Sequence, residues 1–541
     1  MTSPSTQPVV SGGQAAGASA KRGRAPRAGF DAGPRWMMAL PPAVTFVIML
    51  WGITGASYWR DEAATLSAVQ RPLGNLLQTL GNIDAVHGAY YLLIWVAVRL
   101  GGTGELVTRF PSALAMAGAA AAVAALGRRL ISPRAGLAAG LVFAVLPEVS
   151  LYGQNARPYA IVVALAALAS YLLVRAMQDD RGARHRWLAG YAACLAALGI
   201  VDIFGLLLIP AHAVTVALRC LRAGAAARPG EAAGQGQAAR AGEAAGHGEA
   251  GRPGEAGARQ ASRSLALGWL AAAVAGTLLA SPVLALGFVQ RGTLSWLSPP
   301  GLGAVTGLHQ LVGPVLMADA VILVITAGIV VSALAGQERL RANWPGSALA
   351  LSLPWLVLPP AILLVGSLIT PLYTFRYVLL CLPAVALLAG AGLASLGWVA
   401  GTAALVVIAL LGVPAQLKAR GPDGHGDNVR QADRIVAAHA RPGDAVLEFK
   451  AENFAQAYPY GIRQLMPVAQ AETPIESATL VGTFLPDPVV RQRLTRVSRV
   501  WVIEYGHRTP LVILSGLPFR LVRVWQTSDI WLYLYAYSPG G

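Results

Sequence analysis

The chain has 541 residues, of which 55% are hydrophobic and 13% are charged. This composition excludes an ordinary soluble multidomain protein, and apolar runs of spanning length predict an α-helical, multi-pass membrane protein. The formal charge of +16 does not indicate nucleic-acid binding, because the basic residues gather in an N-terminal tail and in short loops, as expected on the cytoplasmic side of a membrane.

The N-terminal part predicts one crossing followed by a large outer loop. Residues 1–35 are rich in Ser, Gly, Ala and Arg and predict a disordered cytoplasmic tail. The first apolar run, Trp36 to Trp59, is long enough for one span and leads out of the cytoplasm. We expect residues 60–108 to form one large extracytoplasmic loop, in which the short apolar run within Ala89 to Leu100 is an interfacial helix.

Charge then sets the sidedness of the later spans. Loops rich in arginine after residues 126 and 177 are expected in the cytoplasm, whereas Asp202 is expected at a tight outer turn. A Gly-, Ala-, Arg- and Glu-rich stretch, residues 222–264, predicts a disordered cytoplasmic loop. The apolar runs within residues 36–415 predict about eleven spans. The three cysteines lie in such runs and indicate no disulfide framework or metal cluster.

Residues 416–541 differ from the rest because charges and prolines return. The segment "VRQADRIVAAHARPGDAVLEF" predicts a helix, a turn and a strand. "SRVWVIEY", "FRLVRVWQ" and "IWLYLYAY" are further strand-like segments. We therefore expect a small extracytoplasmic α/β domain after the last span.

Ionisable residues from distant parts of the chain converge on the predicted outer side: Asp61, Glu62, Asp84, His87, Arg157, His309 and Arg376. Such groups are costly to hold beside membrane spans, so a functional site is the first hypothesis. Structural explanations stay open. Two acids can stabilise the first turn of a helix, an Asp and a His can cap the interfacial helix, and the arginines can anchor loops.

Five motifs follow one another in the chain: an acid pair after the first span, "HGAYYLL", "RFPSALA", "YGQNARPY" and "FRYVLLCLP". Together they resemble the family 39 glycosyltransferases of the GT-C superfamily, over about residues 36–400. This family includes protein O-mannosyltransferases and lipid A aminoarabinose transferases. The resemblance implies a plasma-membrane enzyme that moves a sugar, mannose or another hexose, from a polyprenyl-phosphate donor to an extracytoplasmic protein, lipid or glycan acceptor.

The resemblance also implies roles for single residues. Asp61 matches the catalytic base and Glu62 its neighbour, while Arg157 and Arg376 match groups that hold the carrier phosphate. The other expected substrate contacts are Asp84, His87, Tyr159 and Tyr377. The chain departs from many relatives in having "HGAYY" where they have His-Pro-Pro, and "NAR" lacks an acid that some relatives carry, which leaves the second catalytic group open.

Chemistry agrees with these roles. Arginines stabilise the negative charge that grows on a departing phosphate, and a carboxylate removes the acceptor's proton. A single base opposite the leaving group predicts inversion at the sugar carbon. No cofactor or resident metal is predicted, although some GT-C enzymes use a divalent metal. A transporter or flippase, or a scaffold protein of the cell envelope, are the alternatives.

Overall fold

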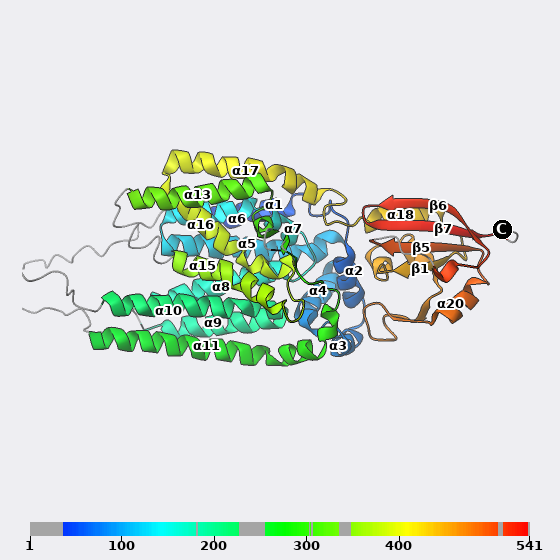
Figure 1. Ribbon diagram of the computed structural model, residues 1–541, viewed down its shortest axis with the longest axis horizontal. Coiled ribbons are helices and arrows are strands. Elements are labelled where there is room, and N and C mark those ends of the chain that lie inside the picture. Colours follow the sequence, from blue (N-terminus) through cyan, green and yellow to red (C-terminus); the bar gives the residue numbers. More distant parts are fainter. Residues whose placement is uncertain are drawn as a thin grey trace, which may run out of the picture.

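The computed structural model describes residues 36–179, 182–226, 255–301, 303–304, 307–334, 348–506 and 512–538. It consists of a long helical bundle with a small sheet domain beyond one end (Figure 1). The predicted tail, residues 1–35, and residues 227–254 of the predicted cytoplasmic loop lie outside the described part. The margins of that loop are helical instead of disordered, since α10 continues to Ala226 and α11 begins at Glu255.

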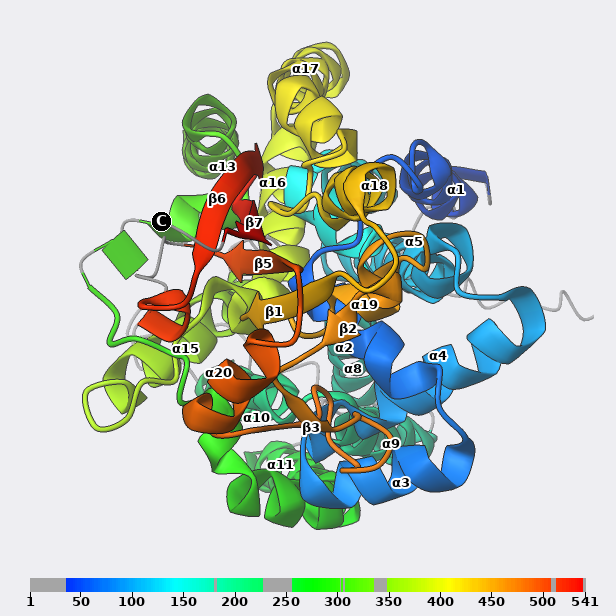
Figure 2. The same ribbon diagram turned by 90° about the vertical axis from the view of Figure 1, so that its right-hand side faces the viewer.

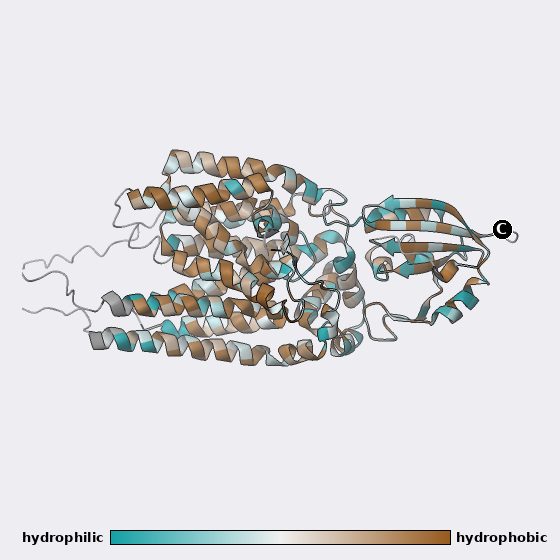
Figure 3. Ribbon diagram, in the orientation of Figure 1, coloured by the Kyte–Doolittle hydropathy of each residue, from teal (hydrophilic) through white to brown (hydrophobic). Residues whose placement is uncertain are grey.

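The bundle is built from apolar helices, brown over most of their length in Figure 3. Among the described residues, eight helices are long and apolar enough to cross a membrane, or nine if the bent pair α6 and α7 is one span. The predicted multi-pass helical fold is thus confirmed, while the number of eleven spans stays a prediction. The helices are α1 (Trp36–Leu50), α5 (Glu105–Leu130), α6 (Pro133–Val145), α7 (Pro147–Gly153), α8 (Tyr159–Met177), α9 (Arg184–Val201), α10 (Leu208–Ala226), α11 (Glu255–Val289), α13 (Val315–Leu334), α15 (Leu349–Gly366), α16 (Leu382–Ser395) and α17 (Trp398–Arg420).

The first helix is shorter than the predicted span Trp36 to Trp59. It ends at Leu50, and Gly52 then takes a left-handed conformation with φ +68°, which a continuing helix cannot contain. Side chains from elsewhere satisfy the carbonyls at its end. Gln154 donates to the carbonyls of Met49 and Trp51 at 2.7 and 2.8 Å, and Arg420 donates to Trp51 at 2.8 Å.

The apolar segment from Pro133 to Gly153 forms two helices in place of one. α6 and α7 meet at Leu146 with a bend of 63°. Pro147 causes the break, because a residue that precedes proline is held in an extended conformation, here φ −62° and ψ 126° at Leu146.

Three helices of residues 60–108 cover the end of the bundle that faces the sheet domain: α2 (Arg60–Val69), α3 (Leu73–Asn82) and α4 (Gly88–Gly101). Figure 2 looks onto this end and shows α3 and α4 lying across it, whereas the long helices are seen along their axes. α4 covers the run Ala89 to Leu100, for which the sequence predicts an interfacial helix, and its position in a membrane stays a prediction. Its Tyr90, Tyr91 and Ile94 are buried, and Leu93 and Val96 are exposed on the opposite face.

The sheet domain contains the predicted helix α18 (Val429–His439) and strands β1 (Ala445–Phe449), β5 (Arg499–Tyr505), β6 (Phe519–Thr527) and β7 (Ile530–Tyr537). With β2 (Met466–Pro467) they form a five-stranded sheet in the order β2-β1-β5-β7-β6. β1 is parallel to β2 and β5, while β7 is antiparallel to β5 and β6. The shorter elements are α19 (Phe454–Ala457), α20 (Asp487–Leu494) and the pair β3 (Gln470–Glu472) and β4 (Thr483–Phe484).

One hydrophobic cluster joins the sheet domain to the end of the bundle. It contains Leu66 and Tyr91 from α2 and α4 together with Val429 and Trp501 from the sheet domain, all buried. α17 also continues past the predicted boundary at residue 415 and ends at Arg420. The sheet domain is therefore packed directly on α4 and on α2, the helix that carries the acid pair.

Candidate functional site

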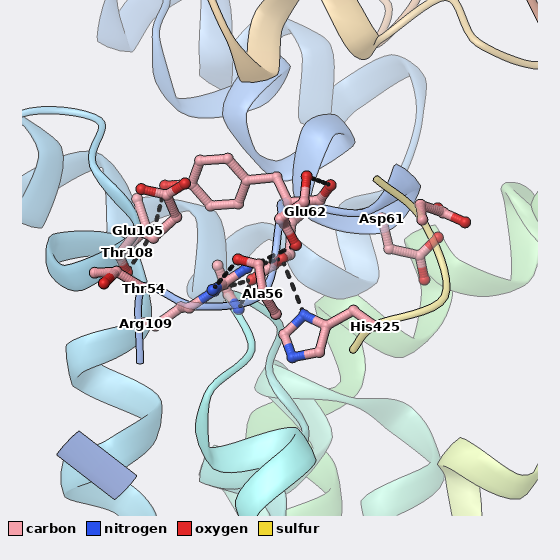
Figure 4. A network of polar contacts seen from close by, with 12 residues as sticks. Thr54, Ala56, Asp61, Glu62, Glu105, Thr108, Arg109 and His425 are labelled. Atoms are coloured by element: carbon pink, nitrogen blue, oxygen red, sulfur yellow. Dashed lines mark hydrogen bonds and ion pairs between the residues drawn. The ribbon is translucent and has the colours of Figure 1, made fainter. Parts of the chain in front are cut away.

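The acid pair lies in the first turn of α2, where carboxylates stabilise the free backbone amides. Neighbouring residues on a helix point in different directions, and the two side chains diverge (Figure 4). Asp61 forms an ion pair with Arg376, which belongs to the short helix η6 (Phe375–Cys381). The side chains of Asp61 and Arg376 are 25% and 19% exposed, so this pair is accessible to solvent.

Aromatic rings frame the guanidinium of Arg376. Its central carbon lies 5.4 Å from the centre of the Trp59 ring and 5.2 Å from that of Trp296. Such cation–π contacts fix the position of the charge without neutralising it. The structure thus brings together two residues that the sequence predicts for one site, although 315 positions separate Asp61 from Arg376.

Glu62 has a different environment, because it is completely buried against Arg109 of α5. The Nε and Nη2 atoms of Arg109 donate to the two carboxylate oxygens of Glu62 at 2.8 and 2.7 Å, and both side chains are 0% exposed. The backbone N–H of Ala156 donates to the same carboxylate at 2.7 Å, and Nδ1 of His425 lies 3.4 Å from it. Glu62 is therefore fully engaged within the protein.

Electrostatics supports a permanently ionised Glu62. Burial alone raises the pKa of the Glu62 carboxyl, but Arg109 and His425 outweigh burial and lower it to about 2. Arg109 also donates to the carbonyls of Ile53, Ala56 and Ser57. This ion pair consequently ties α2 to α5 and to the segment that leads into α2.

A second polar cluster combines the predicted residues Asp84, His87 and Arg157 with Tyr91. Nδ1 of His87 lies 2.7 Å from Asp84, and the Tyr91 hydroxyl donates to the other oxygen of Asp84. Arg157 reaches Nε2 of His87 at 3.2 Å and the Tyr91 hydroxyl at 3.4 Å. Burial raises the pKa of Asp84, but the charges of His87 and Arg157 hold it well below its ordinary value.

Arg157 links the two clusters. Burial lowers the pKa of Arg157, but Tyr91, Tyr159, Asp61 and Asp84 lie near enough to hold it well above its ordinary value. Its Nε is buried and makes no hydrogen bond within the described residues. A buried guanidinium with one uncommitted N–H is suited to an anionic group of a ligand.

The remaining predicted residues lie nearby and make apolar contacts. The ring of Tyr159 meets Tyr152 edge-on at 5.3 Å, and the ring of Tyr377 stacks on Phe204 at 4.0 Å. Neither tyrosine hydroxyl forms a hydrogen bond inside the described ranges. Asp202 lies at the predicted turn and accepts from the backbone N–H of Phe204 at 2.9 Å, which is a structural role. His309 lies in the short helix η4 (Gly307–Leu311).

Sequence reasoning did not identify the residues that hold α2 from the side of the sheet domain. Asp427 accepts from the backbone N–H of Arg60 at 2.9 Å and so caps the N-terminus of α2. Arg430 and Tyr458 donate to the carboxylate of Glu105 at 2.7 and 2.9 Å. Arg109, which opens the apolar run "RFPSALA", is a charged residue at the start of a span and could have been found from the sequence. Asp427 and His425 in "GPDGHGD" carry no comparable signal.

A metal requirement stays untested. Within the part of the chain that is described, no group of three or more His, Cys, Asp and Glu side chains is placed to hold a metal ion.

One family model matches part of the chain. Residues 88–221 match the family model described as Dolichyl-phosphate-mannose-protein mannosyltransferase. The match includes Arg109 and Arg157, and it confirms over these residues the resemblance that the motifs indicate. A comparison with curated proteins finds no match.

Solved structures give weaker similarities. ArnT from Cupriavidus metallidurans in the apo state is 16% identical, covers 92% of this chain and 97% of its own, and gives a TM-score of 0.43. The archaeal oligosaccharyltransferase AglB from Archaeoglobus fulgidus, in complex with an inhibitory peptide and a dolichol-phosphate, is 11% identical with a TM-score of 0.46, covering 87% and 69%. The arabinofuranosyltransferase AftD from Mycobacteria is 14% identical with a TM-score of 0.43, covering 94% and 42%.

Proposed function

We propose that this protein is a membrane glycosyltransferase that moves a sugar from a polyprenyl-phosphate donor to an acceptor outside the cytoplasm. The observation that carries the proposal is the pairing of Asp61 with Arg376 beside the buried, incompletely bonded Arg157. The family-model match supports the same reaction class. Mannose or another hexose is the proposed sugar, and a protein, lipid or glycan is the proposed acceptor.

The charges suit transfer from a phosphate. As the acceptor oxygen attacks the anomeric carbon, the bond from that carbon to the phosphate oxygen breaks and its electron pair stays on the phosphate. Arg157 and Arg376 would stabilise this growing negative charge. A phosphate that pairs with Arg376 competes with Asp61 for the same guanidinium, so donor binding would free the Asp61 carboxylate to accept the acceptor's proton.

The two acids have separate proposed roles. Asp61 is the proposed base, and a single direct attack by the acceptor that it deprotonates would give inversion at the sugar carbon. Glu62 is a positioning residue, because Arg109, Ala156 and His425 engage its carboxylate completely. Asp84, His87 and Tyr91 hold Arg157, and we assign Tyr159 and Tyr377 to the wall of the sugar site.

The test compares transfer of labelled sugar from a polyprenyl phosphate by membranes that contain the wild type, Asp61→Asn or Asp487→Asn. Removal of a general base is expected to lower the rate about 10²- to 10⁴-fold. Asp487 is exposed in α20 and serves as the matched control, expected to act as the wild type. Full transfer by Asp61→Asn at an equal protein level would refute the base, and vectorial solute uptake without a glycosyl product would favour a transporter.

A further inference from the structure

A cavity of about 480 Å³ lies at the end of the bundle away from the proposed active site. α5 shows its location. The helix starts at Glu105, which contacts the sheet domain through Tyr458, and its 26 residues extend roughly 40 Å. Arg128 and Arg129 in its last turn therefore lie at the opposite end, and they line the cavity.

The walls of the cavity have two kinds of surface. Met38, Ala121 and Ala125 form an apolar side. Tyr171 of α8 and Gln178, which follows α8, join the two arginines on the polar side. The space thus suits a ligand that carries both an anionic group and an apolar part.

Two arginines contribute positive charge to the wall of this cavity. No carboxylate lies within ion-pair distance of Arg128 or Arg129 in the described ranges. Arg129 lies over the ring of Tyr171 at 5.8 Å, and Arg175 donates to the Tyr171 hydroxyl at 3.0 Å while lying 3.9 Å over the ring of Trp187. These contacts hold the guanidinium groups of Arg129 and Arg175 beside Tyr171.

Basic residues in the last turn of a helix also stabilise the helix dipole. That effect explains why arginines end α5, and arginines pointing into solvent would serve it equally well. It does not explain why Arg128 and Arg129 are half-buried in the wall of a cavity that also has an apolar side. A ligand explains both features.

We propose that this cavity binds the phosphate-bearing head group of an anionic membrane phospholipid. The end of a bundle of apolar spans lies at the depth of the lipid head groups, and basic pockets between spans are suited to phosphate. Arg128 and Arg129 pair with the phosphate, the Tyr171 hydroxyl and the Gln178 amide hydrogen-bond to the glycerol part, and Met38 and Ala125 contact the start of the acyl chains. This site is independent of the proposed glycosyl transfer.

The experiment measures lipid binding to the purified full-length chain by native mass spectrometry during titration with phosphatidylglycerol, phosphatidylcholine or inorganic phosphate. The double variant R128Q/R129Q is expected to bind phosphatidylglycerol roughly thirtyfold more weakly, since each arginine near a membrane surface contributes about a fivefold gain for anionic lipid. R219Q/R222Q is the matched control. It removes the same charge from exposed positions in the last part of α10, and it is expected to bind as the wild type.

A second variant, Ala125→Phe, keeps both arginines and fills the cavity, so it decides the question if R128Q/R129Q does not fold. It is expected to lose phosphatidylglycerol while remaining monodisperse. Equal losses in R128Q/R129Q and R219Q/R222Q, or unchanged binding by Ala125→Phe, would overturn the site. Tight binding of inorganic phosphate that competes fully with the lipid would overturn the lipid assignment in favour of a free phosphate.

Discussion

Replacing Glu62 by Gln is expected to destabilise the protein strongly. The variant keeps the size of the side chain but removes the negative charge that faces Arg109, and both residues are 0% exposed. Leaving one member of a buried ion pair without its partner costs about 3–5 kcal/mol in the free energy of unfolding. With the amide oxygen in the place of Oε1, the new N–H₂ faces the Nη2 donor of Arg109, so part of the hydrogen bonding is lost as well.

Glu105→Gln provides the control, because it makes the same chemical change in a second ion pair at the same end of the bundle. The side chains of Glu105 and Arg430 are partly exposed, so solvent compensates for part of the loss and the expected cost is about 1 kcal/mol or less. The assay is thermal unfolding in detergent, followed by tryptophan fluorescence. The two single variants Glu62→Gln and Arg109→Met, together with the double variant, measure the coupling between the two residues.

Three results would contradict this reasoning. Glu62→Gln could unfold at the temperature of the wild type, Glu105→Gln could lose as much stability, or the double variant could show no coupling. The acid dependence provides a further check. The pKa of Glu62 is lowered to about 2, so its contribution to stability is fully present above its ordinary pKa near 4.5 and is lost only as the pH falls through about 2.

Other predictions concern the surroundings of α2. Burial raises the pKa of Asp427 from 3.8 to about 6, so the folded state favours its protonated form. Between about pH 4 and pH 6 the wild type should therefore lose on the order of 3 kcal/mol of stability relative to Asp427→Asn, a variant that keeps an acceptor for the backbone N–H of Arg60. Parallel slopes of unfolding temperature against pH in the two proteins would contradict this. Gly55→Ala should lower the free energy of unfolding by at least about 2 kcal/mol, because the new Cβ would lie 2.2 Å from the backbone oxygen of Arg420. An unchanged unfolding temperature would refute this prediction. Arg157→Lys should lower kcat/KM for the polyprenyl-phosphate donor about tenfold with normal folding, since an ammonium lacks the planar fork of the guanidinium. An unchanged kcat/KM would argue against contact between Arg157 and the phosphate.

The sequence predicted those features that depend on local pattern. Helix α18 and strands β1, β5, β6 and β7 follow from periodicity and turn residues within short windows. The convergence of Asp61 with Arg376 followed from counting the sidedness of spans, and the structure places them in contact. The bend at Leu146 has a visible sequence signal in Pro147.

Features that depend on tertiary contacts could not be predicted in this way. The carbonyls at the end of α1 are satisfied by Gln154 and Arg420, which lie far away in the sequence. The pairing of Glu62 with Arg109 joins positions 47 residues apart, and no local pattern distinguishes it from the neighbouring pair of Asp61. Sequence reasoning therefore identified the acid pair but could not assign its two members to different tasks.

The capping of α2 by Asp427 limits how the chain can be divided. A cut after the last span, near residue 415, follows the usual boundary between a membrane part and an appended domain. Here it would remove the partners of Arg60, Glu62 and Glu105 at once, since Asp427, His425 and Arg430 all lie beyond it. The surroundings of α2 are thus completed only when residues 420–430 have folded back onto it. Exchanging the sheet domain between relatives would require residues 420–430 to stay with the helical part.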